Sequence, residues 1–358
     1  IGDKNSASSD NVTAAVDIVS TDFEGNVFIE YAADILTATT DLDAGPLLTD
    51  NAYALFDTSG DDIELPFTGV EIFTVYANSG GSGTESYTFD VDEATGLKEV
   101  EIRSATTGNT TVNIDDYLDT VSVQLGTNVG NAKTTTQAFN NSSIVNINHK
   151  NADGADDVVN LELKDTDMSE GTIDINAAGT ETLNITVSDD VESHQIDLAG
   201  VTATSGEKTT INITGGEATK GITITTTPST TNVIDASEYL GSGVTQSDRN
   251  SSAMTITTNT GADSLRMENA ADVIDAGTGT DTLNVVKTFV LGGISVDLSS
   301  TTDQISTFNG SSNDGIQKGF ENVDLSGVSG SFGASVTAID TGSTITGTKN
   351  SDTITLGT

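Results

Sequence analysis

Three aspartates that recur nine residues apart constrain the fold of this chain more than any other feature. Asp263, Asp272 and Asp281 each lie in a short turn-like segment, and each is followed two positions later by an aliphatic residue. A nine-residue period with Gly, Asp and an aliphatic residue in fixed order is typical of a parallel β-solenoid, in which each repeat supplies a turn and a short strand. Successive repeats return on opposite sides of the solenoid. The spacing therefore predicts that Asp263 and Asp281 stack on one edge and that Asp272 lies on the other.

The residues of these turns predict a site for Ca²⁺. This hard cation takes about six to eight oxygen ligands from carboxylates and backbone carbonyls, and glycine lets a turn adopt the positive φ that points its carbonyls inward. The third repeat has Gly277 and Gly279 at its glycine positions, whereas Glu268 and Ala270 replace both in the second. We therefore expect weaker binding at the second turn. The candidate ligand-bearing residues of the block are Asn259, Gly261, Asp263, Asp272, Gly277, Gly279 and Asp281.

Two further segments match a single repeat. Asp352 follows Gly347 and precedes Ile354 near the end of the chain, and Asp156 stands between Gly154 and Val158 in the same register. Both are candidate calcium ligands, and the alternative for each is an ordinary Asx turn. For residues 259–284 the alternative is a Gly/Asp-rich series of hairpins that falls on the same period.

Alternation of aliphatic and polar residues recurs from about residue 63 onward, as in Val121–Leu125, Val159–Leu163 and Leu183–Val187. This alternation is typical of half-buried strands. It predicts an all-β fold, mainly a right-handed parallel β-solenoid or β-roll with calcium-binding nonapeptide turns. An antiparallel sandwich is the alternative, because it also has short strands at regular intervals.

The same patterns predict three regions. Residues 1–62 are expected to form an irregular N-terminal cap or small domain, with short helices over 31–36 and 47–56. Residues 63–250 are expected to form an irregular β-solenoid, and residues 251–358 a calcium-binding β-roll with further C-terminal strands. The first residue is Ile rather than Met, as expected of a fragment or a processed chain.

The charge balance excludes several classes of partner. The chain has 54 Asp and Glu residues against 13 Lys and Arg, a net charge of −41. Nucleic acids and anionic membrane surfaces need basic patches, so neither is an expected partner. The absence of cysteine excludes disulfides and thiolate metal sites. No apolar run approaches the length of a transmembrane helix, and no nucleophile elbow or phosphate-binding loop is present, so we expect a protein that is not an enzyme.

The nine-residue block resembles the RTX (repeats-in-toxin) group of secreted bacterial proteins. Phrases such as Gly69-Val-Glu-Ile-Phe-Thr-Val75 and Gly319-Phe-Glu-Asn-Val-Asp-Leu-Ser326, spread over about 63–358, are similar to RTX-type surface-layer (S-layer) proteins of Gram-negative bacteria. This resemblance implies an extracellular location on the bacterial cell surface, export by type I secretion and calcium-dependent assembly into a lattice.

We therefore expect a structural, calcium-dependent subunit that assembles with copies of itself. A cell-surface polysaccharide is a second candidate partner. Two alternatives remain open. One is an extracellular adhesin or matrix-binding module, and the other is the non-catalytic RTX portion of a larger secreted enzyme.

Overall fold

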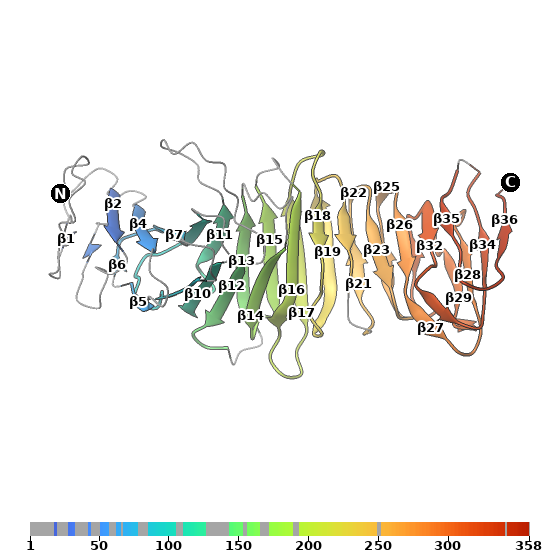
Figure 1. The fold of residues 1–358 in the computed structure, drawn as a ribbon, viewed down its shortest axis with the longest axis horizontal. Helices are drawn as coiled ribbons and strands as arrows, with labels where there is room; N and C mark the ends of the chain where they lie inside the picture. The colour runs from blue at the N-terminus through green and yellow to red at the C-terminus, as the bar shows by residue number, and fades with distance from the viewer. Residues whose placement is uncertain are drawn as a thin grey trace.

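The computed structural model shows an elongated all-β molecule, in which short strands stack side by side along the long axis (Figure 1). No helix occurs among the residues that the structure describes, and hence none that is long and apolar enough to cross a membrane. The described residues are 18–19, 28–32, 42–43, 51–56, 62–65, 67–77, 85–104, 110–126, 143–152, 156–164, 172–188, 193–248, 252–340 and 342–357.

Two 12-stranded sheets, which we call sheet 1 and sheet 2, form the body of the molecule. Sheet 1 contains β5 (Asp62–Glu64), β8 (Glu85–Asp90), β10 (Thr110–Tyr117), β12 (Ile144–His149), β14 (Ile173–Ala178), β16 (His194–Thr202), β18 (Ile222–Ile224), β20 (Val244–Gln246), β23 (Ser264–Met267), β26 (Thr282–Val285), β32 (Asn322–Asp324) and β35 (Ile345–Thr346). Sheet 2 contains β2 (Phe28–Ala32), β4 (Asn51–Phe56), β7 (Ile72–Ala77), β9 (Glu99–Ser104), β11 (Ser122–Gly126), β13 (Val158–Leu163), β15 (Thr182–Val187), β17 (Thr209–Gly215), β19 (Thr231–Tyr239), β21 (Thr255–Thr257), β24 (Val273–Asp275) and β31 (Gln317–Lys318). From β4 to β32 the chain therefore alternates between the two long sheets, one strand in each.

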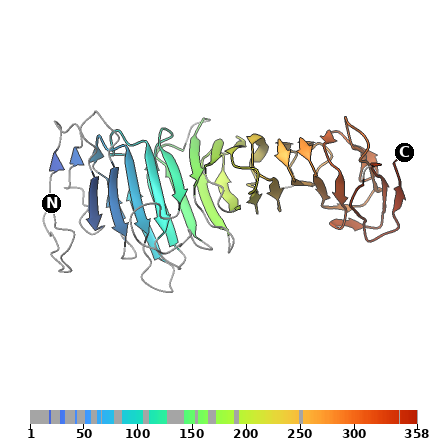
Figure 2. The same ribbon diagram turned by 90° about the horizontal axis from the view of Figure 1, so that it is seen from above.

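Smaller sheets flank this body. They comprise β1 (Ile18–Val19), β3 (Leu42–Asp43) and β6 (Phe67–Thr68); β22 (Thr260–Gly261) and β25 (Thr278–Gly279); β27 (Lys287–Phe289) and β33 (Val328–Gly330); and β28 (Ile294–Asp297), β29 (Ile305–Phe308), β30 (Ser311–Ser312), β34 (Ala334–Thr337) and β36 (Thr353–Thr355). The strands are longest in the middle of the molecule, where β16 and β19 have nine residues each. They shorten to four residues or fewer in the nine-residue repeats that follow (Figure 2).

Every neighbouring pair of strands in the two long sheets is parallel. This confirms the predicted parallel solenoid and excludes the antiparallel sandwich. Antiparallel pairs occur among the described strands only where β29 contacts β28 and β30.

The core consists of aliphatic columns between the sheets. Val123 pairs with Leu161, Leu161 with Ile185, and Ile185 with Ile213, and all four side chains are buried. Parallel register places like residues above like residues, so each coil covers the apolar surface of its neighbour. Burial of this kind stabilises by about 25 cal/mol per Å² of apolar area, and a single coil could not achieve it alone.

Asparagine ladders run beside these columns on the half-buried face of each sheet. In sheet 2, Asn184 Nδ2 donates to Asn160 Oδ1 at 2.9 Å, and Asn212 Nδ2 donates to Asn184 Oδ1 at 2.8 Å. Sheet 1 repeats the arrangement in a ladder of Asn113, Asn146 and Asn176, with bonds of 2.6 and 2.8 Å. Stacked amides satisfy one another only in an in-register parallel sheet, so the ladders oppose any slip in register.

The structure corrects one prediction for the N-terminal region. A short helix was expected over 47–56, but Asn51–Phe56 forms strand β4, which pairs in parallel with β7. The pairing partner overrides the local sequence preference. In the other predicted helix, 31–32 end strand β2, and 33–36 lie outside the described residues. The division at 62 and 250 stays a prediction, and one or both long sheets run through each of these positions.

The sheet 2 ladder can be tested at its central residue. Asn184→Ala removes one donor and one acceptor, and it leaves two half-buried amides without their partners. We expect the free energy of unfolding to fall by about 1–3 kcal/mol, measured by chemical denaturation at constant Ca²⁺. Thr186→Ala on the exposed part of the same strand is the control, with an expected change within about 0.5 kcal/mol. Equal losses in the two variants would show that the ladder adds nothing specific.

Candidate calcium site on one edge of the nine-residue repeats

The repeats fold with the predicted alternation. Strands β23 and β26 join sheet 1 and begin directly after Asp263 and Asp281, and β24 joins sheet 2 directly after Asp272. Ser264 pairs with Thr282 in parallel register. The predicted placement is therefore confirmed, with Asp263 and Asp281 on one edge and Asp272 on the other.

On the shared edge each acidic side chain caps the coil before it. Asp263 Oδ1 accepts a hydrogen bond from the backbone N–H of Val244 at 2.6 Å, and Asp281 Oδ1 accepts one from the N–H of Asp263 at 2.8 Å. Glu321 continues the column, because its Oε2 accepts from the N–H of Asp281 at 2.8 Å. Each carboxylate thus binds the amide of the residue that occupies the same register position one coil earlier.

The second oxygens of the two repeat aspartates have no such partner. Asp263 is 2 % exposed and Asp281 is 0 % exposed. Oδ2 of each is buried and makes no hydrogen bond. An unsatisfied buried carboxylate oxygen carries a full desolvation penalty. Two such oxygens from stacked turns are the donor type that a calcium ion requires.

The glycines of these turns allow close backbone approach. A Cβ atom on Gly277 would lie 2.1 Å from the carbonyl oxygen of Asn259, and one on Gly279 would lie 1.6 Å from the carbonyl oxygen of Gly261. Gly261 and Gly277 also have positive φ angles of 123° and 71°. Two carbonyl oxygens of the first turn therefore face the second turn at close range. The residues present fit Ca²⁺, since carboxylates and backbone carbonyls together would hold it.

Asp272 lies in a turn that satisfies itself. Its Oδ1 accepts from the N–H of Met254 at 3.0 Å, and its Oδ2 accepts from the N–H groups of Glu268 at 3.1 Å and Asn269 at 2.9 Å. Glu268, which replaces a motif glycine, forms an ion pair with Arg266 at 2.6 Å. The turn without glycines therefore meets the needs of its carboxylate with protein groups alone, and Asp272 fits a cation less well than Asp281.

Asp352 resembles Asp272 rather than Asp281. Its Oδ1 accepts from the N–H of Ala334 at 2.8 Å, and its Oδ2 accepts from the N–H of Thr348 at 2.9 Å. Both oxygens have partners, and the side chain is half-buried. The structure thus favours the capping role for Asp352 over a calcium site.

Around residue 156 the structure places a neighbouring residue in the capping column. Asp156 is exposed, whereas Asp157 is 9 % exposed and stands directly before β13. The N–H of Asp157 donates to Glu181 Oε2 at 3.1 Å, as in the columns above. Gly154 of the predicted turn lies outside the described residues.

Sequence reasoning missed Glu181 and Glu321. Glu321 lies 40 residues from Asp281 rather than eighteen, because β27–β30 intervene before the coil resumes. A usable signal was present in both cases, since each glutamate stands directly before a strand that alternates polar and aliphatic residues.

Burial and like charges disfavour ionisation on this edge. Burial raises the pKa of Asp281 to about 7. The hydrogen bond from the Asp263 N–H lowers this pKa, whereas the negative charges of Asp263 and Glu321 raise it further. Burial also raises the pKa of Asp263, opposed by the hydrogen bond that its Oδ1 accepts from the Val244 N–H. A cation held between the carboxylates would reverse this penalty.

Groups of three close acidic or imidazole side chains occur elsewhere, at two places among the described residues. One comprises Asp90, Asp92 and Asp116, where Lys150 forms an ion pair with Asp92. Burial raises the pKa of Asp90 to about 6, and the charges of Asp92 and Asp116 add to the effect. The other comprises Asp119, His149 and Asp157.

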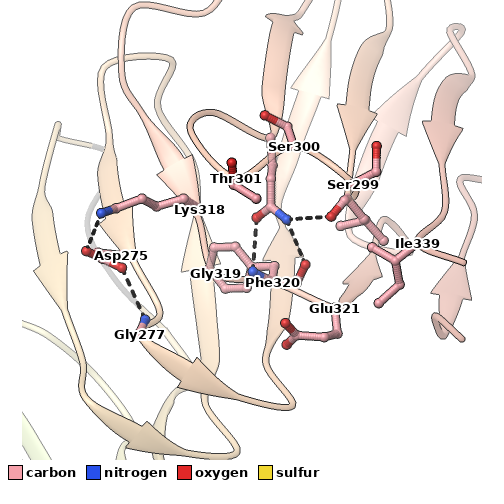
Figure 3. A pocket seen from close by; sticks show the side chains of 12 residues that line it. Asp275, Gly277, Ser299, Ser300, Thr301, Lys318, Gly319, Phe320, Glu321 and Ile339 are labelled. Carbon is pink, nitrogen blue, oxygen red and sulfur yellow. Dashed lines mark hydrogen bonds and ion pairs between the residues drawn. The ribbon is translucent and has the colours of Figure 1, made fainter. Parts of the chain in front are cut away.

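A polar pocket of about 400 Å³ lies beside the column of Asp263, Asp281 and Glu321, and Glu321 is part of its lining (Figure 3). Asp275 and Lys318 form an ion pair of 2.8 Å at one side. Gln304 also lines the pocket, and its Nε2 donates to the carbonyls of Leu298 at 3.0 Å and Phe320 at 2.7 Å. Phe320, the one aromatic residue of the lining, is 1 % exposed. Its ring is therefore not available to stack against a sugar.

Comparison of the chain with protein-family models, with curated proteins and with solved structures gave no match. The assignment of a role to these residues therefore depends on their chemistry and geometry.

The two edges of the repeat block predict unequal calcium affinity. Asp281→Asn retains the oxygen that caps Asp263 but removes the charge and the unpaired oxygen. We expect it to weaken calcium binding by about tenfold or more, equivalent to about 1.4 kcal/mol. Asp272→Asn is the matched control and should change the affinity by less than about threefold. Isothermal titration calorimetry of both variants is the measurement, and equal losses would contradict the assignment of the edge.

A pH dependence follows from the raised pKa of Asp281. The folded chain holds this proton more tightly than the unfolded chain, whose carboxyl group titrates near the ordinary value of 3.8. In excess chelator the contribution to stability is therefore complete below about pH 4 and is lost as the pH rises through about 7. Hydrogen exchange of β23 and β26 with pH measures the loss. Asp281→Asn should flatten the profile, and a profile that keeps its slope in this variant would assign the effect to other groups.

Proposed function

We propose that this protein is a calcium-stabilised structural β-solenoid of a bacterial cell surface that assembles with copies of itself. The observation that carries the proposal is the pair of buried, unpaired oxygens of Asp263 and Asp281 on one edge of the repeats. No comparable cost is built into the Asp272 turn, where protein groups satisfy the same side chain.

Calcium supplies positive charge to this edge when it binds. Asp263 and Asp281 would hold the ion with one carboxylate oxygen each, and the turns at 258–261 and 276–279 would contribute backbone carbonyls. The ion would neutralise two buried acids in a chain of net charge −41. Because the unfolded chain does not assemble these ligands, calcium stabilises the folded form by mass action. An ion with this role belongs to an environment rich in Ca²⁺, which supports an extracellular location.

Assembly is supported by exposed apolar side chains near the C-terminal coils, away from the edge that carries Asp263 and Asp281 (Figure 1). Val290, Leu291 and Phe332 are 67 %, 71 % and 37 % exposed. Phe289 pairs with Gly330, so these side chains lie just beyond the paired ends of β27 and β33. Exposed apolar groups of this size favour contact with another surface. The acidic surface opposes close approach of two copies until Ca²⁺ screens or bridges its carboxylates.

The test is assembly of the purified chain across a calcium series. We expect ordered arrays on the order of millimolar Ca²⁺ and dispersal when chelator is added. Light scattering and electron microscopy are the measurements. Mg²⁺ at the same ionic strength should replace Ca²⁺ poorly, because it demands tight octahedral geometry and releases water reluctantly.

Variants separate the assembly surface from the calcium site. Leu291→Asp should prevent assembly and leave calcium affinity unchanged, whereas Asp281→Asn should reduce both. Leu240→Asp is the control, since Leu240 is also exposed, at 56 %, but lies outside this surface. A chain that binds calcium and stays monomeric at every concentration would contradict assembly and favour the adhesin alternative.

A further inference from the structure

The cluster of Asp119, His149 and Asp157 contains a histidine, and it lies in a different part of the solenoid from the edge that carries Asp263 and Asp281. One ligand atom from each residue lies within 4.8 Å of the others. Asp119 stands in the connection between β10 and β11, His149 ends β12, and Asp157 directly precedes β13. Two successive coils therefore contribute to the cluster, which lies outside the nine-residue repeats.

The imidazole of His149 is the feature that points to a ligand. Its side chain is 1 % exposed, and it packs edge-on against the ring of Tyr117 with ring centroids 5.5 Å apart. Nδ1 is buried, makes no hydrogen bond and lies 3.3 Å from Asp119 Oδ1. A buried ring nitrogen that faces two carboxylates and lacks a hydrogen bond needs either a proton or a metal ion.

Thr180 fixes the other side of the ring. His149 Nε2 lies 2.9 Å from Thr180 Oγ1, and Thr180 is 0 % exposed. A proton on Nε2 would be donated to this hydroxyl, which leaves Nδ1, at 3.3 Å from Asp119 Oδ1, with an unprotonated lone pair. Metal-binding histidines characteristically donate their second ring N–H to an oxygen of the protein, which fixes the tautomer and the ring orientation.

The backbone holds Asp157 in place. Its N–H donates to Glu181 Oε2 at 3.1 Å, and its carbonyl accepts from the N–H groups of Glu181 and Thr182 at 3.0 and 3.1 Å. Asp119, whose side chain is 42 % exposed, lies on the solvent side. The cluster thus has two buried ligands in fixed positions and one accessible to water.

From this geometry we propose that Asp119, His149 and Asp157 bind a divalent transition-metal ion of the Zn²⁺ type, with Thr180 as the positioning residue. One nitrogen and two carboxylates suit Zn²⁺, whereas Ca²⁺ takes oxygen ligands. Three protein ligands leave a further coordination position for water. The ion would join two successive coils of the irregular part of the solenoid, independently of the calcium edge.

The test is titration of the whole chain with Zn²⁺ while excess Ca²⁺ occupies the carboxylate sites. We expect one saturable Zn²⁺ site per chain by calorimetry, and Co²⁺ should bind at the same site with visible d–d absorption whose intensity reports its coordination number. Asp119→Asn should weaken Zn²⁺ binding by about tenfold or more. Because Asp119 is partly exposed, this change should not impair folding. Asp156→Asn, an equal change of charge at an exposed neighbour, should leave the affinity within about twofold.

The role of Thr180 has its own test. Thr180→Val keeps the shape and removes the hydroxyl, and we expect it to weaken Zn²⁺ binding by about 10–100-fold. Thr180→Ser should restore most of the affinity. Absence of a saturable site, or equal losses in Asp119→Asn and Asp156→Asn, would overturn the proposal and leave a protonated His149 paired with Asp119. An unchanged affinity in Thr180→Val would remove the positioning role.

Discussion

In-register parallel stacking of coils is the constraint on which this structure depends. Each strand of the long sheets pairs with the strand one coil earlier, so residues that share a register position form a column along the molecule. A column of aliphatic residues, such as Val123, Leu161 and Ile185, becomes continuous core. A column of asparagines becomes a ladder of amide hydrogen bonds. A side chain that is repelled by an identical neighbour in its column therefore destabilises this fold.

Acidic residues are the hardest test of that constraint, because like charges in a column repel. Four of them, Asp263, Asp272, Asp281 and Asp352, stand directly before a strand, where one carboxylate oxygen accepts from an amide of the preceding coil. At Asp272 and Asp352 the second oxygen also finds backbone donors within its own turn. The second oxygens of Asp263 and Asp281 have no such donors. In the Asp281 turn the equivalent N–H groups, those of Gly277 and Thr278, donate instead to Asp275 Oδ1 and to the carbonyl of Asn259.

The two parts of the solenoid bring different side chains to the corner directly before a strand. The tight repeats have only carboxylates and carbonyls on their edge, which is a chemistry for calcium. The longer coils before them bring a histidine to the same kind of corner. There Asp157 stands directly before β13 and its N–H donates to Glu181 Oε2, and His149 Nδ1 lies 3.3 Å from Asp119 Oδ1. A single backbone plan thus presents hard oxygen ligands in one region and a mixed nitrogen and oxygen set in another.

Local pattern determined much of this protein from the sequence alone. Alternation predicted the strands, the nine-residue period predicted their parallel stacking, and the spacing placed Asp263 and Asp281 on one edge, because side-chain direction and repeat length are properties of the chain itself. Tertiary structure decided what depends on partners distant in sequence. It made 51–56 a strand through pairing with β7, put Glu321 in a column with a residue 40 positions away, and placed Asp157 rather than Asp156 in the capping position. It also gave both carboxylate oxygens of Asp272 hydrogen-bond donors and left Oδ2 of Asp281 without one, since hydrogen bonds from backbone amides depend on turn geometry that residue types alone do not specify.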